Sequence, residues 1–257
     1  MNHSMNQEPS QHVDDQIDIV SQSPLLRWLD NFWYHYKWTV IIVAFFVIVI
    51  LVCILQMTGD PVYDIHITYS GPYGFGSSDA ESMYRDLSSS LPTDINGDGV
   101  KNAGFIRYQI YSEEEILAEW KQVEELREQA EARGEDPSEI VSSINTAYNS
   151  AQFQQFTNSL LTGQSYILIC SPFIYEEVKG NGRVCRLADL SDTPIENAFD
   201  ECAVLLKDTA MYQKSEIFQR LPEDTVICLL NEIPALFSQS NDTDHASAVE
   251  TFLGMIR

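Results

Sequence analysis

Residues 38–57, WTVIIVAFFVIVILVCILQM, form an apolar run that divides the chain into a short leading part and a long following part. None of these twenty residues is charged at neutral pH, and the strongly polar Gln56 stands near the end. At a rise of 1.5 Å per residue, a helix of this length spans roughly 30 Å, which matches the hydrocarbon core of a bilayer. A buried helix of a water-soluble core would usually be shorter and interrupted by polar residues. The run therefore predicts one transmembrane helix in a lipid bilayer.

The residues that flank this run indicate its orientation. Arg27 and Lys37 precede it, whereas Asp60 and Asp64 follow it. Because positively charged flanks are retained in the cytoplasm, we expect a cell-membrane protein with a cytoplasmic N-terminus and an extracytoplasmic C-terminal part. Residues 1–26 hold no Lys or Arg, so they lack the basic leader of a cleaved signal peptide and predict an uncleaved signal anchor. Aromatic side chains typical of the headgroup region stand on the N-terminal side: Trp28, Phe32, Trp33, Tyr34, Tyr36 and Trp38.

The chain is expected to have three parts. Residues 1–26 are polar and predict a disordered cytoplasmic tail, 27–58 form the juxtamembrane aromatic segment and the transmembrane helix, and 61–257 form one extracytoplasmic domain. The 200 residues after position 57 carry 33 acidic and 13 basic side chains. Such a surface repels nucleic acid and would attract cations or basic partners, but a plain acidic coat that keeps the domain soluble is the favoured explanation.

Four cysteines lie in this domain, namely Cys170, Cys185, Cys202 and Cys228. An even number in an exported domain permits two disulfides, with three connectivities. Cys170 and Cys228, however, lie in apolar runs where a free thiol serves as a small core residue. The sequence leaves both states open, and the absence of a C-x-x-C pair makes a zinc or redox site unexpected.

Hydrophobic periodicity and capping signals predict alternating strands and helices. We expect strands at 63–70, 105–111, 166–170, 183–187, 202–206 and 225–230, and helices at 79–91, from 113 onward, at 136–161, 172–177 and 244–256. Alternation of this kind predicts an α/β fold, specifically a three-layer sandwich with a mostly parallel sheet, preceded by the transmembrane helix.

One segment resembles a known family. Residues 155–190, QFTNSLLTGQSYILICSPFIYEEVKGNGRVCRLADL, hold a helix that ends at a Gly turn, a buried strand, a short helix and a G-x-(apolar)-x-x-L-x-D-L tail. This order resembles bacterial extracytoplasmic solute-binding proteins, and ITYSGP at 67–72 is similar to their first strand and loop. The resemblance implies a single lobe, since two-lobed binding proteins are longer. The overall layout is similar to uncharacterised membrane-anchored proteins of Gram-positive gut bacteria, which implies a location and no activity.

The sequence DINGDG at 94–99 matches the first six positions of a D-x-N-x-D-G calcium loop. Oxygen ligands at this spacing converge on a hard cation. Position twelve is Phe105 in place of the usual bidentate Glu, so a remote acid would have to complete the shell. The same residue types also build a tight turn, and the sequence leaves calcium and a plain turn as alternatives. The residues of this predicted calcium site are Asp94, Asn96, Asp98, Val100 and Asn102.

A glycine-rich loop follows the first predicted strand. Its glycines are Gly71, Gly74 and Gly76, whose spacing is neither a dinucleotide fingerprint nor a P-loop. Open α/β sheets bind ligands beyond the carboxyl ends of their strands, so this loop is either a ligand-facing loop or an ordinary connection. The predicted ligand-binding residues at this edge are Tyr69, Ser70, Gly71, Tyr73, Gly74, Phe75 and Ser171.

The sequence contains no pattern of a catalytic site. The domain holds two histidines, His66 and His245, and neither a G-x-S-x-G nor an H-E-x-x-H motif. We therefore expect a non-catalytic, single-pass extracytoplasmic protein that binds a small solute or an envelope protein. The alternative is a structural or scaffolding subunit of a membrane complex that acts through the acidic domain and the helical pair 113–161. An envelope hydrolase of unrecognised type is a third alternative.

Overall fold

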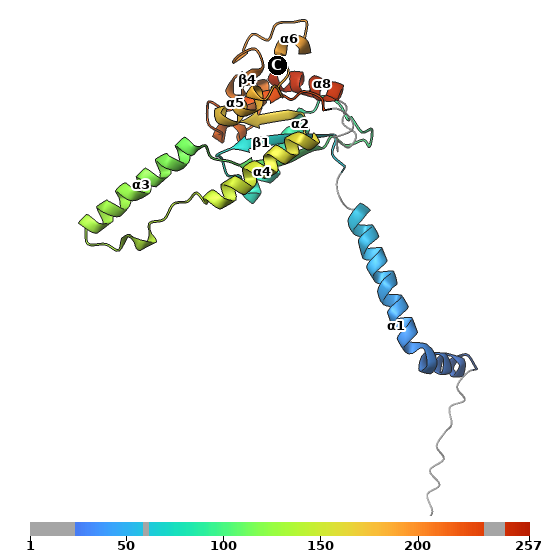
Figure 1. Cartoon of the computed structure of the whole chain (residues 1–257). Coiled ribbons are helices and arrows are strands. Elements are labelled where there is room, and N and C mark those ends of the chain that lie inside the picture. The colour runs from blue at the N-terminus through green and yellow to red at the C-terminus, as the bar shows by residue number, and fades with distance from the viewer. Residues whose placement is uncertain (1–23, 59–61, 234–244) are drawn as a thin grey trace, which may run out of the picture. The chain divides into compact units, whose positions relative to one another are not determined.

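The computed structural model describes residues 24–58, 62–233 and 245–257, and the chain divides into two compact units, Met1–Asp60 and Pro61–Arg257. The first unit contains helix α1 (Pro24–Thr58), which Figure 1 shows as two stretches that meet at an angle. Its segment Phe32–Leu55 is long and apolar enough to cross a membrane, as the sequence predicts. Most of the predicted disordered tail lies outside the described residues, since α1 begins at Pro24.

The second unit is built on a five-stranded sheet with the order β2-β1-β3-β5-β4. Strand β1 (Ile65–Gly71) runs parallel to β2 (Ala103–Gln109) and β3 (Ile167–Cys170), whereas β5 (Val226–Leu229) runs antiparallel to β3 and to β4 (Ala203–Leu205). The α/β class is confirmed. The sheet is mixed, so the expected mostly parallel sheet is not confirmed. An apolar run indicates that a strand is buried on both faces of a sheet. It does not indicate whether the strand pairs in a parallel or an antiparallel direction.

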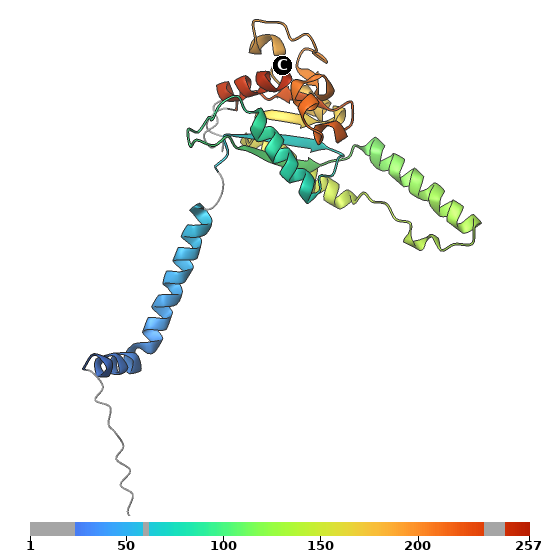
Figure 2. The same cartoon turned by 180° about the vertical axis from the view of Figure 1, so that it is seen from behind.

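Apolar side chains form a hydrophobic cluster on each face of the sheet, because successive strand residues point to opposite faces. One cluster includes helices α2 (Ser77–Ser90) and α8 (His245–Ile256), and the other includes α4 (Thr146–Thr162) and α5 (Pro172–Gly180). Helix α4 lies in front of the sheet in Figure 1, and α2 lies in front in the reverse view of Figure 2. Both clusters are drawn from residues 65–256, so the fragment 61–257 contains a complete core of its own.

Capping signals predict the start of one helix correctly and the start of another wrongly. Helix α3 (Glu113–Ala132) begins at the predicted capping box, in which the Ser112 hydroxyl accepts from the Glu115 N–H and the Glu115 carboxylate accepts from the Ser112 N–H. The second predicted helix, 136–161, was expected to begin at Asp136. That residue instead caps a single 3-10 turn, η1 (Pro137–Glu139), and α4 begins after Asn145.

The remaining elements are short. The prediction of a strand at 183–187 is wrong. Val184 makes one isolated bridge to Leu230, and a helix begins at Leu187. The short elements are α6 (Leu187–Leu190), η2 (Leu206–Asp208), α7 (Ala210–Lys214) and η3 (Phe218–Arg220).

Candidate binding site at the carboxyl ends of the parallel strands

The predicted ligand-binding residues lie together where β1 and β3 end. The Ser171 N–H donates to the Ser70 carbonyl at 3.0 Å, which joins the ends of the two strands. Gly71 closes β1, and its carbonyl accepts from the Ile110 N–H at 2.9 Å beyond the end of β2. The residues gathered at this edge are Tyr69, Ser70, Gly71, Tyr73, Gly74, Phe75 and Ser171.

The aromatic residues of the loop pack on one another. The Tyr69 side chain is buried, and its hydroxyl accepts a hydrogen bond from the Tyr73 N–H at 3.1 Å. The Phe75 ring meets the rings of Tyr69, Tyr73 and Phe105 edge to face, with centroids 4.9, 4.8 and 5.2 Å apart. Burial raises the pKa of the Tyr69 hydroxyl, so it stays neutral. The loop therefore forms a wall of closely packed aromatic side chains at this edge.

Close packing explains two of the three loop glycines, Gly71 and Gly74. A Cβ atom added to Gly71 would lie 2.8 Å from the Tyr69 hydroxyl oxygen, and one added to Gly74 would lie 2.8 Å from Gln109 Nε2. Gln109 Nε2 in turn donates to the Pro72 carbonyl at 3.2 Å and to the Tyr111 hydroxyl oxygen at 2.6 Å. This glutamine holds the loop against the end of β2, so packing within the fold accounts for Gly71 and Gly74 without a bound anion.

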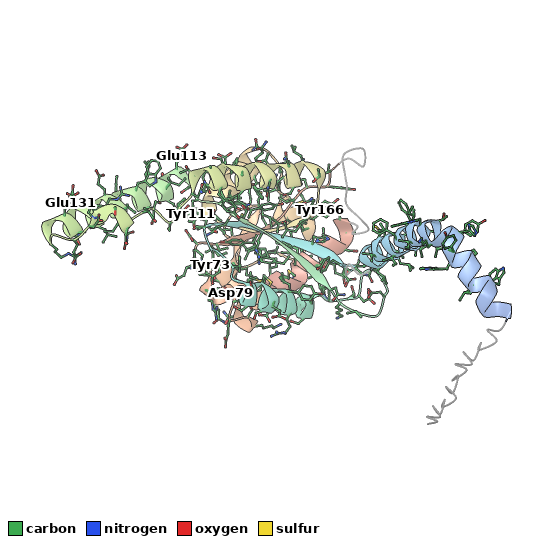
Figure 3. All side chains as sticks on the ribbon, turned by 90° about the horizontal axis from the view of Figure 1, so that it is seen from below. Tyr73, Asp79, Tyr111, Glu113, Glu131 and Tyr166 are labelled. Carbon is green, nitrogen blue, oxygen red and sulfur yellow. The ribbon has the colours of Figure 1, made fainter. Side chains whose placement is uncertain are left out.

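A groove with a volume of about 360 Å³ lies beside this wall, at the root of α3. Tyr111 follows β2, Phe173 follows β3, and Phe153 comes from α4, so the groove stands beyond the carboxyl ends of two parallel strands. Tyr111 and Glu113 are seen at the root of α3 in Figure 3. The groove is lined by Tyr111, Glu113, Ile116, Thr146, Asn149, Ser150, Phe153 and Phe173.

Hydrogen bonds between the Asn149 side chain and the Tyr111 backbone hold one wall of the groove. The Asn149 side chain accepts from the Tyr111 N–H at 2.8 Å and donates to the Tyr111 carbonyl at 3.0 Å, which ties α4 to the end of β2. One turn further along α4, the Phe153 ring lies 6.4 Å from the Phe173 ring. A groove held by paired backbone contacts is largely preformed, which lowers the entropic cost of binding.

The groove combines aromatic walls with negative charge at its rim. Glu113 is exposed there. Burial raises the pKa of Tyr111; the hydrogen bond from Gln109 opposes this shift, and the nearby carboxylates of Glu115 and Glu119 add to it. Tyr111 is therefore a neutral hydroxyl at neutral pH. Aromatic faces next to a carboxylate suit a ligand with an apolar body and a positive charge.

Sequence reasoning missed this groove because its walls come from four separate parts of the chain. The prediction placed a ligand site in the glycine loop, at the same edge of the sheet as this groove. A usable signal was present, since Tyr111 ends the predicted strand 105–111 and Phe173 stands two residues after the predicted site residue Ser171.

The predicted calcium loop is a closed turn. The Asp94 carboxylate accepts from the Gly97 N–H at 2.8 Å and from the Gly99 N–H at 2.7 Å. Asn96 and Asp98 each accept a hydrogen bond from the N–H two residues later, at 2.9 and 2.8 Å. Gly97 and Gly99 have φ of +75° and +90°, which favours glycine at both positions.

The other predicted calcium ligands have different surroundings. Val100 is exposed, and the Asn102 side chain accepts from the Tyr84 hydroxyl at 2.8 Å. Phe105, at the twelfth position, lies in β2 and packs on Phe75. In residues 24–58, 62–233 and 245–257, no group of three His, Cys, Asp or Glu side chains is placed to hold a metal ion. These contacts favour the plain turn.

The five cysteines of the chain are free thiols. Cys170 and Cys228 are buried in the neighbouring strands β3 and β5, where they act as core residues. Cys185 contacts two polar side chains, with its sulfur 3.1 Å from Asn231 Oδ1 and 3.8 Å from His245 Nε2. Burial raises the pKa of the Cys185 thiol to about 11, and His245 Nε2 lies 3.0 Å from the Leu230 carbonyl. An activated cysteine needs a lowered pKa, so this contact is a structural one.

A second, half-buried polar cluster also serves the fold. The Asp200 carboxylate accepts hydrogen bonds from the Tyr175 hydroxyl at 2.7 Å and from Lys179 Nζ at 2.6 Å. It also accepts from the backbone N–H groups of Cys202 and Ala203 at 2.8 and 3.0 Å. Asp200 therefore fastens the start of β4 to α5, and its acceptor positions are used within the fold.

Comparisons of the chain with protein-family models, with curated proteins and with solved structures found no match.

Proposed function

We propose that the protein is a single-pass membrane protein with a cytoplasmic N-terminus and an extracytoplasmic domain at 61–257. The side chains of Phe32–Leu55 are not buried against protein, and such an apolar surface is stable only in an apolar solvent. Arg27 and Lys37 on one side and Asp60 on the other support the orientation. We also propose that the domain is a three-layer relative of a single lobe of solute-binding proteins.

The proposed activity is the non-catalytic binding of a small organic cation with an aromatic or aliphatic body. One observation carries it: Tyr111, Phe153 and Phe173 wall a groove beyond the carboxyl ends of β2 and β3, and Glu113 lies at its rim. The aromatic faces would hold the apolar body, and the carboxylate would hold the positive charge.

Two observations support a binding role over a catalytic one. The groove residues include no thiol and no histidine, and the described Cys185–His245 contact pairs a raised thiol pKa with a histidine that faces a backbone carbonyl. General acid–base or nucleophilic chemistry requires a matched pair within hydrogen-bond reach of a substrate.

The test uses three matched probes and the fragment 61–257. Phenethylammonium, 2-phenylethanol and 3-phenylpropionate share a phenyl ring and differ in charge. A ligand that binds only the folded state raises the midpoint of thermal unfolding. We expect the cation to raise the midpoint most, the alcohol less and the carboxylate least. The Glu113 carboxylate attracts a positive charge and repels a negative one.

Two variants locate the binding. Phe153→Ala removes one wall and should weaken binding of the cation by about tenfold or more. Phe199→Ala removes an exposed ring outside the groove and should leave binding unchanged. Glu113→Gln should lower the affinity for the cation toward that for the alcohol. Equal midpoints with all three probes, or equal losses in the two phenylalanine variants, would contradict the proposal.

The scaffolding alternative is favoured by a separate observation. Helix α3 extends away from the sheet, from Glu113 at its root to Glu131 near its far end (Figure 3). In this helix Ala130 is the one fully buried residue, so most of its surface is available for contact.

A further inference from the structure

Helix α3 and the segment that returns beside it form a projecting arm, defined here as residues 113–145. The arm is held together along its length. Arg127 Nε donates to the Ile140 carbonyl at 2.7 Å, and the Glu119 carboxylate accepts from both the N–H and the hydroxyl of Ser143, at 2.9 and 2.7 Å. Together with the capping box at its root, these bonds make the arm an ordered element.

Two large apolar side chains stand in solvent on this arm. Leu117 is 51% exposed and Trp120 is 50% exposed. They are three residues apart in a helix, so they are neighbours on one face, which we call the Leu117–Trp120 face. Leu126 is 41% exposed, but at 100° per residue it stands about half a turn away from Leu117 around the helix. An exposed Trp beside an exposed Leu is the kind of anchor that dominates protein interfaces.

The charges around these side chains are mostly negative. Glu124 follows Trp120 by four residues and Glu128 follows Glu124 by four, so both lie along the Leu117–Trp120 face. Over residues 113–139 the arm carries eleven acidic and three basic side chains. A second copy of the arm and an anionic bilayer would both be repelled by this charge, whereas a basic protein surface would be attracted.

We propose that the Leu117–Trp120 face docks a protein partner through a basic amphipathic segment of that partner. Apolar side chains of the segment would cover Leu117 and Trp120, and its Lys or Arg side chains would pair with Glu124 and Glu128. In recognition of this type, apolar anchors supply affinity, and the surrounding charges supply the association rate and partner choice. The inference does not depend on the ligand groove.

The chain offers a direct reporter for this contact. Trp120 is the single tryptophan of residues 61–257, so the fluorescence of the fragment reports the surroundings of this one side chain. The probe is an 18-residue helical peptide of Leu and Lys, and its counterpart has Glu in place of Lys. We expect the Lys peptide to shift Trp120 emission to shorter wavelength at low salt, with an affinity that falls as salt rises. The Glu peptide should give no shift.

Matched variants separate docking from general attraction to an acidic protein. Leu117→Ala should weaken binding of the Lys peptide by about tenfold, whereas Leu126→Ala, on the other side of the same helix, should change it by less than about twofold. Glu124→Gln with Glu128→Gln should reduce both the affinity and its salt dependence. Helix content, measured by circular dichroism, checks that each variant is folded.

Several outcomes would overturn the proposal. Equal losses of affinity for the Lys peptide in Leu117→Ala and Leu126→Ala would mean that the Leu117–Trp120 face has no special role. An equal emission shift with the Glu peptide would mean that charge plays no part in docking. A blue shift that grows with the concentration of the fragment alone would indicate a second copy as the occupant, and a shift with anionic vesicles would indicate a membrane surface. Loss of ligand binding in Phe153→Ala bears on the groove alone, so the two proposals fail separately.

Discussion

Asp64, which is buried, and Asn102 form two hydrogen bonds with each other, and each residue donates one of them. The Asp64 N–H donates to the Asn102 carbonyl at 2.8 Å, and the Asn102 N–H donates to the Asp64 carboxylate at 2.7 Å. The other carboxylate oxygen accepts from the N–H groups of Ile95 and Asn96 at 2.7 and 2.9 Å. Asp64 therefore holds the first part of the DINGDG turn, and Asn102 after the turn, against the start of β1.

Asp64→Ala should destabilise the fragment 61–257 by about 3 kcal/mol, because three backbone N–H groups would lose a charged acceptor in a buried place. Asp98→Ala is the matched control. Its carboxylate is exposed and accepts one N–H from its own turn, so the loss should stay below about 1 kcal/mol. Urea unfolding monitored by circular dichroism measures both. Equal losses would show that the Asp64 contacts contribute little.

Calcium should leave the thermal midpoint of this fragment unchanged relative to a chelator. The turn supplies two carboxylates, Asp94 and Asp98, and the nearby Asp64 already accepts three backbone hydrogen bonds. The twelfth position, Phe105, is part of a packed strand. A calcium-dependent rise in the midpoint that disappears in Asp98→Ala would instead establish the predicted metal loop and refute the plain turn.

Much of the sheet was readable from the sequence, because buried strands need apolar runs and helix ends need caps. The runs that contain Ile67 and Ile169 became β1 and β3, and Ser112 and Gly163 mark the ends of α3 and α4. These are local signals: each depends on burial or on backbone groups within a few residues. They are therefore visible without knowledge of the rest of the fold.

Features that depend on distant contacts were not readable. The direction of β5 is set by its pairing with β3 and β4, and its apolar residues would be buried in either direction. The extended return after Asp136 is held by Arg127 and Glu119 on another element, which overrides a good local helix start. The groove likewise joins Tyr111 with Phe153 and Phe173, whose proximity only the tertiary fold creates.

Gly104 should tolerate no side chain, because a Cβ atom there would lie 2.3 Å from His66 Nδ1 and 3.1 Å from the Tyr63 ring. Gly104→Ala should therefore destabilise the domain by about 2 kcal/mol through overpacking. At Gly180 a Cβ atom would meet open space, so Gly180→Ala should be neutral or slightly stabilising. If the clash with His66 is the cause, Gly104→Ala should cost much less in a His66→Ala background. An equal cost in both backgrounds would refute it.

The same histidine gives the domain a pH dependence near neutrality. Burial lowers the pKa of His66 below its usual 6.5, and its Nδ1 atom has no hydrogen-bond partner among the described residues. The folded state therefore favours the neutral ring, and the unfolded state binds a proton more readily. The resulting stability is present above pH 6.5 and is lost as the pH falls through 6.5 toward the lowered pKa. We expect the free energy of urea unfolding to decrease from about pH 7.5 to about pH 5 in the wild type and to decrease less in His66→Gln. Parallel curves for the two proteins would show that His66 has the same pKa in the folded and unfolded states.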